Sequence, residues 1–152
     1  MKKNAWILFI MIFAGTVSLY GQSGDVTGIW RTENRDSQVE IYRTSSGTYE
    51  GKLVWLKEPL DENGKIKRDG DNPDENLRSR PLKGLVLLKE FQYDAADKEW
   101  GGGKIYDPES GKTYEAYMWM DGNNKLHIKG YLMGMRWMGR STSWTRDRAV
   151  LD

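Results

Sequence analysis

Short runs of alternating apolar and polar residues, separated by clusters of turn-forming residues, follow one another along most of the chain. The separating clusters read ENRDS, TSSG, DENG, DAAD, DPESGK, DGNN and MGM. Clusters of Gly, Asn, Asp and Ser between β-branched and aromatic runs mark the turns of hairpins. The pattern predicts eight strands, at about 26–32, 37–44, 48–58, 85–93, 99–107, 113–120, 125–132 and 136–146.

Three of these runs alternate with a period of two, which is typical of antiparallel strands that bury one face. Their expected inner faces are Val39 and Ile41; Tyr114, Ala116, Met118 and Met120; and Leu126, Ile128 and Leu132. No comparable helical period follows the first 24 residues.

Eight sequential strands joined by short turns predict an all-β fold, an antiparallel up-and-down barrel. A two-sheet β-sandwich is the alternative. In such a barrel every odd-numbered link lies at the same end, so the long third link, at about 59–84, would cap one mouth beside the fifth link, DPESGK at 107–112. The expected architecture is one barrel domain with one long capping loop.

The N-terminus has the order of a secretory signal peptide. Lys2 and Lys3 precede an apolar run that ends near Tyr20, and small residues follow, with cleavage expected between Gly21 and Gly24. The run is shorter than the roughly 20 residues of a spanning helix. We therefore expect a cleaved segment at 1–24, a single domain at 25–152, a periplasmic or secreted location, and no stable membrane insertion after cleavage.

The net charge and the absence of cysteine exclude several classes of partner and of chemistry. Loss of residues 1–24 removes two of the 23 basic residues and none of the 22 acidic ones, which leaves a net charge of −1. A near-neutral chain is not a natural partner for nucleic acid or for an anionic membrane. The chain has no cysteine, so thiol catalysis and cysteine metal sites are excluded. Nothing in the composition indicates the oligomeric state.

The stretch DGDNPDENLRSRPLKG, residues 69–84, carries the candidate chemistry. If it is extended around Arg78 and Arg80, both guanidinium groups lie on one side and could clamp a carboxylate or phosphate. Alternatively, these arginines pair with Asp71, Asp74 or Asp107 and pin the loop. Pro73 and Pro81 restrict the loop, and we expect it to be ordered.

Other chemistry is less well supported by the pattern. The acidic residues around 61–75 lack the spacing of a calcium-binding loop, so a solvated, internally paired loop is expected, with no metal and no cofactor. His127 stands within a strand and is interpreted as a packed or exposed residue. A carboxylate enzyme would use Asp71 or Asp74 with Asp107, but no nucleophile–base pair is visible, and we expect no enzyme.

Four segments together resemble a known family: GIW at 28–30, DNPDENLRSRPLKGL at 71–85, GGKIYDPESGKTYEAYM at 102–118 and GRSTSWTR at 139–146. They resemble the bacterial domain of unknown function 2147, which implies an exported protein and supplies no catalytic residues. GIW with a late arginine is also similar to lipocalin-like barrels. That resemblance implies that Trp30 packs under Arg146 at the closed end, a structural contact.

The sequence thus predicts an exported lipocalin-like protein that binds a small, partly apolar, anionic ligand. An adaptable lining is expected from Met118, Met120, Met133, Met135 and Met138. The first alternative is a module that binds an envelope protein or glycan; the second is the carboxylate enzyme. The candidate ligand-binding residues are Arg78, Arg80, Asp71, Asn72, Asp74, Asp107, Tyr106 and Lys112.

Overall fold

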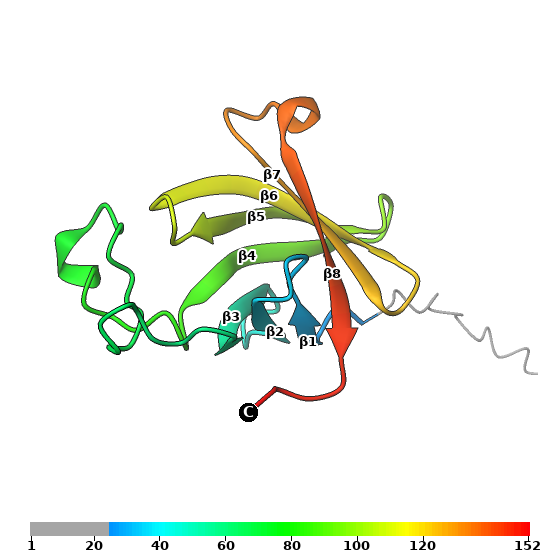
Figure 1. Cartoon of the computed structure of the whole chain (residues 1–152). Helices are drawn as coiled ribbons and strands as arrows, with labels where there is room; N and C mark the ends of the chain where they lie inside the picture. The colour runs from blue at the N-terminus through cyan, green and yellow to red at the C-terminus, as the bar shows by residue number, and fades with distance from the viewer. Residues whose placement is uncertain (1–24) are drawn as a thin grey trace, which may run out of the picture.

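The computed structural model describes residues 25–152, so the expected signal peptide lies outside the described residues. Eight strands form a closed antiparallel barrel in chain order (Figure 1). They are β1 (Gly28–Arg31), β2 (Ser37–Arg43), β3 (Tyr49–Leu56), β4 (Val86–Asp94), β5 (Glu99–Asp107), β6 (Lys112–Asp121), β7 (Lys125–Tyr131) and β8 (Arg140–Asp147). Two short 3-10 turns, η1 (Glu75–Leu77) and η2 (Arg136–Met138), interrupt the longer links.

The first and last strands close the barrel. Trp30 in β1 pairs with Arg146 in β8, and Ile29 pairs with Asp147. Closure leaves no free sheet edge among these strands, which removes the template for edge-to-edge aggregation. The predicted up-and-down barrel is confirmed, and the sandwich alternative is wrong because β1 and β8 belong to one continuous sheet.

The interior is filled with side chains toward one end. Trp30, Phe91, Leu88, Met118 and Leu126 are fully buried. The alternation predicted for β2 is confirmed, because Val39 and Ile41 belong to the same core. Each large aromatic side chain removes about 150–250 Å² from water, so the core holds the barrel together without disulfide bonds.

Arg146 closes this filled end over Trp30. Its guanidinium lies 4.3 Å from the centre of the indole ring, and Trp30 itself donates to the carbonyl oxygen of Val26 at 2.8 Å. The Arg146 nitrogens donate to three backbone carbonyls, those of Asp25, Thr27 and Asn123. The contact that the resemblance to lipocalin-like barrels implied is therefore confirmed.

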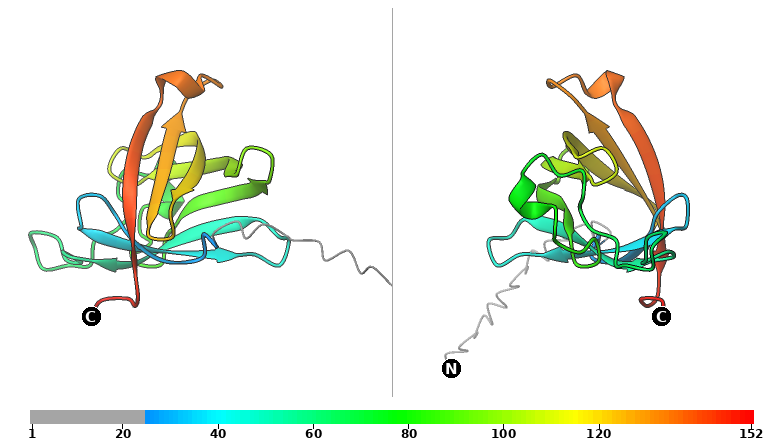
Figure 2. Two further views of the ribbon diagram at one scale, coloured as in Figure 1. Left: turned by 90° about the vertical axis from the view of Figure 1, so that its right-hand side faces the viewer. Right: turned by 60° about the vertical axis from the view of Figure 1, so that its left-hand side comes forward.

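The eighth strand begins later than predicted. Residues 136–138 form η2, and β8 starts at Arg140. The chain reverses at Met133 and Gly134, whose φ angles are both positive, so it cannot continue the ladder there. Leu132 lies beyond the end of β7 and is exposed, which contradicts its predicted inward position. We call residues 132–139 the methionine-rich link; Figure 2 shows it projecting beyond the rest of the barrel.

The long third link, which we call the charged loop (residues 59–84), is ordered by its own backbone. Asp69 donates its amide hydrogen to the carbonyl of Arg80 at 3.0 Å, and Leu82 donates to that of Lys67 at 3.0 Å. Two isolated bridges, Leu60 with Ile66 and Arg68 with Pro81, fold the loop into two adjoining hairpin-like turns. The prediction of an ordered loop is confirmed.

The charged loop touches the DPESGK turn. This contact was predicted because both are odd-numbered links, which lie at the same end of an up-and-down barrel. A side chain at Gly111 would overlap the carbonyl oxygen of Asp71. Gly111 also has a φ of +66°, a conformation that side chains disfavour. Glycine is therefore required here both by the backbone conformation and by the close approach of the loop.

We expect Gly111→Ala to lower the free energy of unfolding by about 2–4 kcal/mol, because the methyl group forces the turn and the loop apart. Gly122→Ala is the matched control, since Gly122 has a φ of +67° but no neighbouring atom within 4 Å of the place that the added methyl group would occupy. It should cost only about 1 kcal/mol. Urea unfolding of both variants gives the comparison; equal losses would show that the turn and loop do not press together.

Candidate ligand-binding mouth

A buried carboxylate organises the charged loop. Asp69 is fully buried and accepts hydrogen bonds from Tyr106 at 2.5 Å, Asn72 at 2.8 Å and Arg80 Nε at 2.8 Å. Arg80 also approaches with Nη2, 2.7 Å from the same carboxylate oxygen. Because Tyr106 belongs to β5, this network ties the loop to the barrel wall.

The network sets the protonation of its members. Burial alone would raise the pKa of Asp69, but the hydrogen bonds from Tyr106, Asn72 and Arg80, with the charge of Arg80, outweigh burial and lower it. Burial and the neighbouring Asp69 carboxylate raise the pKa of Tyr106. Asp69 is therefore held as the anion and Tyr106 as the neutral donor, which are the forms that this hydrogen bond needs.

Both arginines of the LRSRP stretch are engaged within the loop. Arg80 pairs with Asp69, while Arg78 donates to the carbonyl oxygen of Asn72 at 2.7 Å and lies 3.4 Å from Glu75. The predicted partners Asp71, Asp74 and Asp107 are wrong. Arg78 has helical backbone angles at the end of η1, so the extended geometry that would have aligned the two side chains does not form.

The remaining predicted residues are divided among local roles. Asp74 caps η1 by accepting from the amide of Asn76. The Asp107 side chain accepts from Ser110 at 2.6 Å and from the amide of Glu109 at 3.0 Å, which closes the DPESGK turn. Asp71 and Asp107 do line one groove together. Within residues 25–152, no group of three or more His, Asp or Glu side chains is placed to hold a metal ion.

The mouth of the barrel holds a cavity of about 740 Å³. We call it the mouth cavity. Ile105, Tyr114 and Ile128 line its inner wall, and the methionine-rich link forms one side with Leu132, Met133, Met135 and Met138. Its volume lies within the range of about 300–1,000 Å³ that small-molecule sites occupy. The predicted methionine lining is found at the link, whereas Met118 is fully buried in the core.

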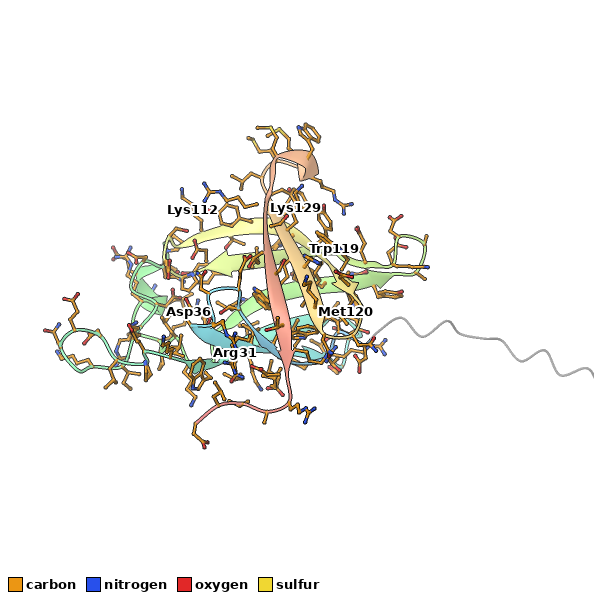
Figure 3. All side chains as sticks on the ribbon, turned by 45° about the vertical axis from the view of Figure 1, so that its right-hand side comes forward. Arg31, Asp36, Lys112, Trp119, Met120 and Lys129 are labelled. Carbon is orange, nitrogen blue, oxygen red and sulfur yellow. The ribbon has the colours of Figure 1, made fainter. Side chains whose placement is uncertain are left out.

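Three of the predicted site residues, Tyr106, Asp107 and Lys112, line the mouth cavity. Arg140, at the start of β8, lines it too and was not predicted. Arg140, Thr142 and Trp144 alternate along β8 and so share the face of the strand that points into the barrel. That alternation could have identified Arg140 from the sequence. Figure 3 labels Lys112 at the end of β6 that reaches the mouth, with Trp119 nearer the other end.

A second groove lies at the same mouth beneath the charged loop. It shares Asp107 and Pro108 with the mouth cavity and has a volume of about 910 Å³. More acidic than basic side chains line it: Asp36, Glu58, Asp61, Asp71, Asp107 and Glu109 against Lys57, Lys65, Lys67 and Arg68. Because acidic side chains predominate in its lining, this groove suits an anion less well than the mouth cavity does.

His127 lies on the outer wall, away from the mouth cavity. Its ring stacks on Trp119 with 5.0 Å between ring centres, and its Nδ1 lies 2.9 Å from the hydroxyl of Ser143. Trp119 in turn stacks on Tyr117. The histidine is thus part of an outer stack across strands, in agreement with its interpretation as a packed strand residue.

A closed eight-stranded barrel that is filled at one end and hollow at the other defines a lipocalin-like protein, and the comparisons agree. Residues 28–146 match the family described as an uncharacterized protein conserved in bacteria, DUF2147. The chain belongs to this family. Protein HP1028 from the human pathogen Helicobacter pylori, described as belonging to the lipocalin family, is similar in structure: its TM-score is 0.68 and its sequence identity 26%, over 81% of this chain and 83% of that one.

No curated protein matches the sequence. A lipocalin-like fold is in general a ligand-binding fold and is typically non-enzymatic. In the described part of the chain, no helix has the length and apolarity that a membrane crossing requires.

Proposed function

We propose that this protein is an exported carrier that binds a small amphiphile with an apolar tail and an anionic end in the mouth cavity. The observation that carries the proposal is a hollow of ligand size with an apolar, methionine-rich wall and two basic side chains, Lys112 and Arg140. Export is supported by the signal-like sequence of residues 1–24.

The polarity of the mouth cavity favours an anion. Lys112 and Arg140 form no ion pair with residues 25–152, whereas Asp107, the only acidic side chain in the lining, is hydrogen-bonded within its own turn. Two such cations at the edge of an apolar hollow would hold a carboxylate, sulfonate or phosphate through charge-assisted hydrogen bonds. The tail would gain from leaving water, about 0.8 kcal/mol per buried methylene group.

The arginines of the charged loop are assigned a structural role in this proposal. Arg80 is paired with a buried carboxylate and Arg78 with a backbone carbonyl, so a ligand would have to displace existing partners. Of the eight candidates from the sequence, Lys112, Tyr106 and Asp107 remain at the proposed site, while Arg78, Arg80, Asp71, Asn72 and Asp74 build the loop beside it.

The experiment compares two ligands of equal chain length, dodecanoate and dodecanol, by calorimetric titration of the chain that begins at Asp25. That chain contains all eight strands. We expect dodecanoate to bind more tightly than dodecanol. The variant Lys112→Gln with Arg140→Gln should weaken dodecanoate binding about tenfold, equivalent to about 1.4 kcal/mol, and leave dodecanol binding unchanged.

Lys125→Gln with Arg148→Gln is the matched control, because it removes the same charge at exposed positions outside the mouth cavity. It should bind both ligands like the unaltered chain. The proposal is wrong if neither ligand binds the unaltered chain, or if the control weakens dodecanoate binding as much as the cavity variant does.

A further inference from the structure

The rim of the mouth cavity carries a concentrated patch of exposed apolar side chains. Met133 is 83% exposed, Trp137 74%, Met138 70% and Leu132 52%. All four belong to the methionine-rich link, which projects from the barrel (Figures 1 and 2). Single exposed apolar residues are ordinary, but a contiguous patch marks an interaction surface.

Folding stability gives no reason for this composition. Met133 combines the greatest exposure with a φ of +51°. A left-handed backbone is unfavourable for a residue with a side chain other than asparagine or aspartate, and asparagine or glycine would fill the position at lower cost. A large apolar side chain held in an unfavourable backbone conformation and turned to water indicates a role outside the folded core.

The link is fixed in position. Arg136 Nη2 lies 2.7 and 2.9 Å from the two carboxylate oxygens of Glu99, and its guanidinium lies 3.7 Å from the centre of the Tyr117 ring. Gly134 donates its amide hydrogen to Glu115 at 2.8 Å. These contacts anchor the link to β5 and β6, so its apolar side chains are presented without a large ordering cost on binding.

Three basic side chains around the link lack an ion pair, and the acidic side chains near them accept hydrogen bonds from other groups. Lys112, Lys129 and Arg140 form no ion pair with residues 25–152, while the nearby acids Glu99 and Glu115 are engaged by Arg136 and Gly134. The net charge of the whole chain is nearly neutral, so it does not reveal this local excess of unpaired basic side chains. A projecting apolar tip with cations set behind it matches the layering of a membrane surface, in which acyl chains lie beneath anionic headgroups.

We infer that the methionine-rich link docks the barrel on a lipid bilayer that carries anionic headgroups, with Trp137, Met133 and Met138 entering the interface. Tryptophan favours this depth because its ring is both apolar and polar. Leu132, Met133 and Met138 also line the mouth cavity, so the docked rim is continuous with the hollow. The inference rests on the proposed function in one respect: if the protein carries an amphiphile, docking would let that amphiphile pass from the membrane directly into the cavity.

A bilayer suits this surface better than a protein partner does. The exposed side chains belong to a link that projects beyond the barrel (Figure 2), and a fluid bilayer adapts to a projecting tip. Unbranched methionines beside one tryptophan offer apolar area with little shape of their own. Docking through one link is shallow, because only the few side chains at its tip reach the interface.

The test is flotation of the chain that begins at Asp25 with vesicles of phosphatidylethanolamine and phosphatidylglycerol, and separately with vesicles of phosphatidylcholine alone. We expect flotation with the anionic vesicles, weakened by added salt because exposed charges are screened. Bromine-labelled acyl chains should quench Trp137 fluorescence. Met133→Ser with Trp137→Ser should reduce the bound fraction about tenfold without changing the unfolding midpoint, and Trp137→Ser alone should give a smaller reduction.

Val150→Ser with Leu151→Ser is the matched control, since it removes two exposed apolar side chains from the C-terminal segment, and it should float like the unaltered chain. No flotation of the unaltered chain, or equal flotation of the Met133–Trp137 variant, overturns the inference. If the unaltered chain is a dimer that does not bind vesicles, and the Met133–Trp137 variant is a monomer, the inference is overturned in favour of self-association. Dodecanoate binding is measured without vesicles, so failure of docking and failure of the carrier proposal are distinguishable.

Discussion

Replacing Arg146 with alanine should lower the free energy of unfolding by about 3 kcal/mol. The guanidinium lies over Trp30 at 4.3 Å and donates to the carbonyls of Asp25, Thr27 and Asn123. Removing it leaves these acceptors without their charged donor and opens the closed end of the barrel to water. A hydrogen bond to a charged group contributes about 1.5–3 kcal/mol, and the cation over the indole about 1–2 kcal/mol; partial replacement by water keeps the total below their sum.

Two further variants separate charge from geometry at this position. Arg146→Lys keeps the cation but lacks the planar fork that reaches several carbonyls at once, so it should recover only about 1 kcal/mol of the loss. Arg148→Ala removes an exposed arginine two residues away and should change stability by less than about 0.5 kcal/mol. Urea unfolding followed by tryptophan fluorescence measures all three, and an unchanged midpoint for Arg146→Ala would contradict the capping role.

The second large effect is expected at Asp69. Asp69→Ala should cost about 3 kcal/mol, because it leaves Arg80 without its carboxylate and Tyr106 and Asn72 without their acceptor. Breaking one side of a buried ion pair costs about 3–5 kcal/mol, and the partial exposure of Arg80 places the expected value at the lower end. Because the network belongs to the charged loop, hydrogen exchange at the amides of Asn72 and Leu82 should accelerate more than exchange in the core.

The same carboxylate predicts a dependence on pH. The pKa of Asp69 is lower in the folded protein than its usual value of about 3.9. The unfolded chain therefore binds the proton more readily, so the contribution of Asp69 is fully present above about pH 4 and is lost as the pH falls through the folded pKa. The stability difference between the unaltered chain and Asp69→Asn should accordingly shrink on acidification, and a difference independent of pH would contradict the ionised network.

The double variant Asp69→Asn with Arg80→Gln completes a cycle for this pair. Its loss should be smaller than the sum of the two single losses, since each single change already removes the pairing. Additive losses would show that Arg80 and Asp69 act independently. Ligand titration on the same proteins gives the second reading: if dodecanoate binding survives loss of the pair, the arginine pins the loop and does not recognise the anion.

The sequence predicted the strands well because their signals are local. Alternation within β2 and β6 and the turn residues between strands are fixed by a few neighbouring positions, and only one boundary failed badly, at residues 136–139. There the runs of methionine and tryptophan were typical of a strand, but the positive φ angles of Met133 and Gly134 turned the chain out of the sheet. An apolar run does not reveal whether it faces a core or a rim.

The site was harder to predict because it depends on contacts across the chain. Arg80 contacts Asp69 because the bridge between Arg68 and Pro81 folds the loop back on itself and places the two residues side by side. The mouth cavity likewise combines Lys112 at the start of β6 with Arg140 at the start of β8, which barrel closure brings to one mouth. The resemblance of its motifs to a bacterial family named the family correctly but assigned no ligand to it.

What the sequence by itself determined is the barrel: eight strands in order, their alternating inner faces, the parity that sets the charged loop beside the DPESGK turn, and the pairing of Trp30 with Arg146. The strands, their inner faces and the position of the loop follow from the period of two and from chain order, whereas the pairing of Trp30 with Arg146 was implied by the resemblance to lipocalin-like barrels. Only the tertiary structure decided which end is filled, which arginines are already paired, and that Met133 and Met138 are largely exposed to water. Those features depend on side-chain packing and on the strained turn at Met133, where distant residues compete for the same space and the same hydrogen bonds.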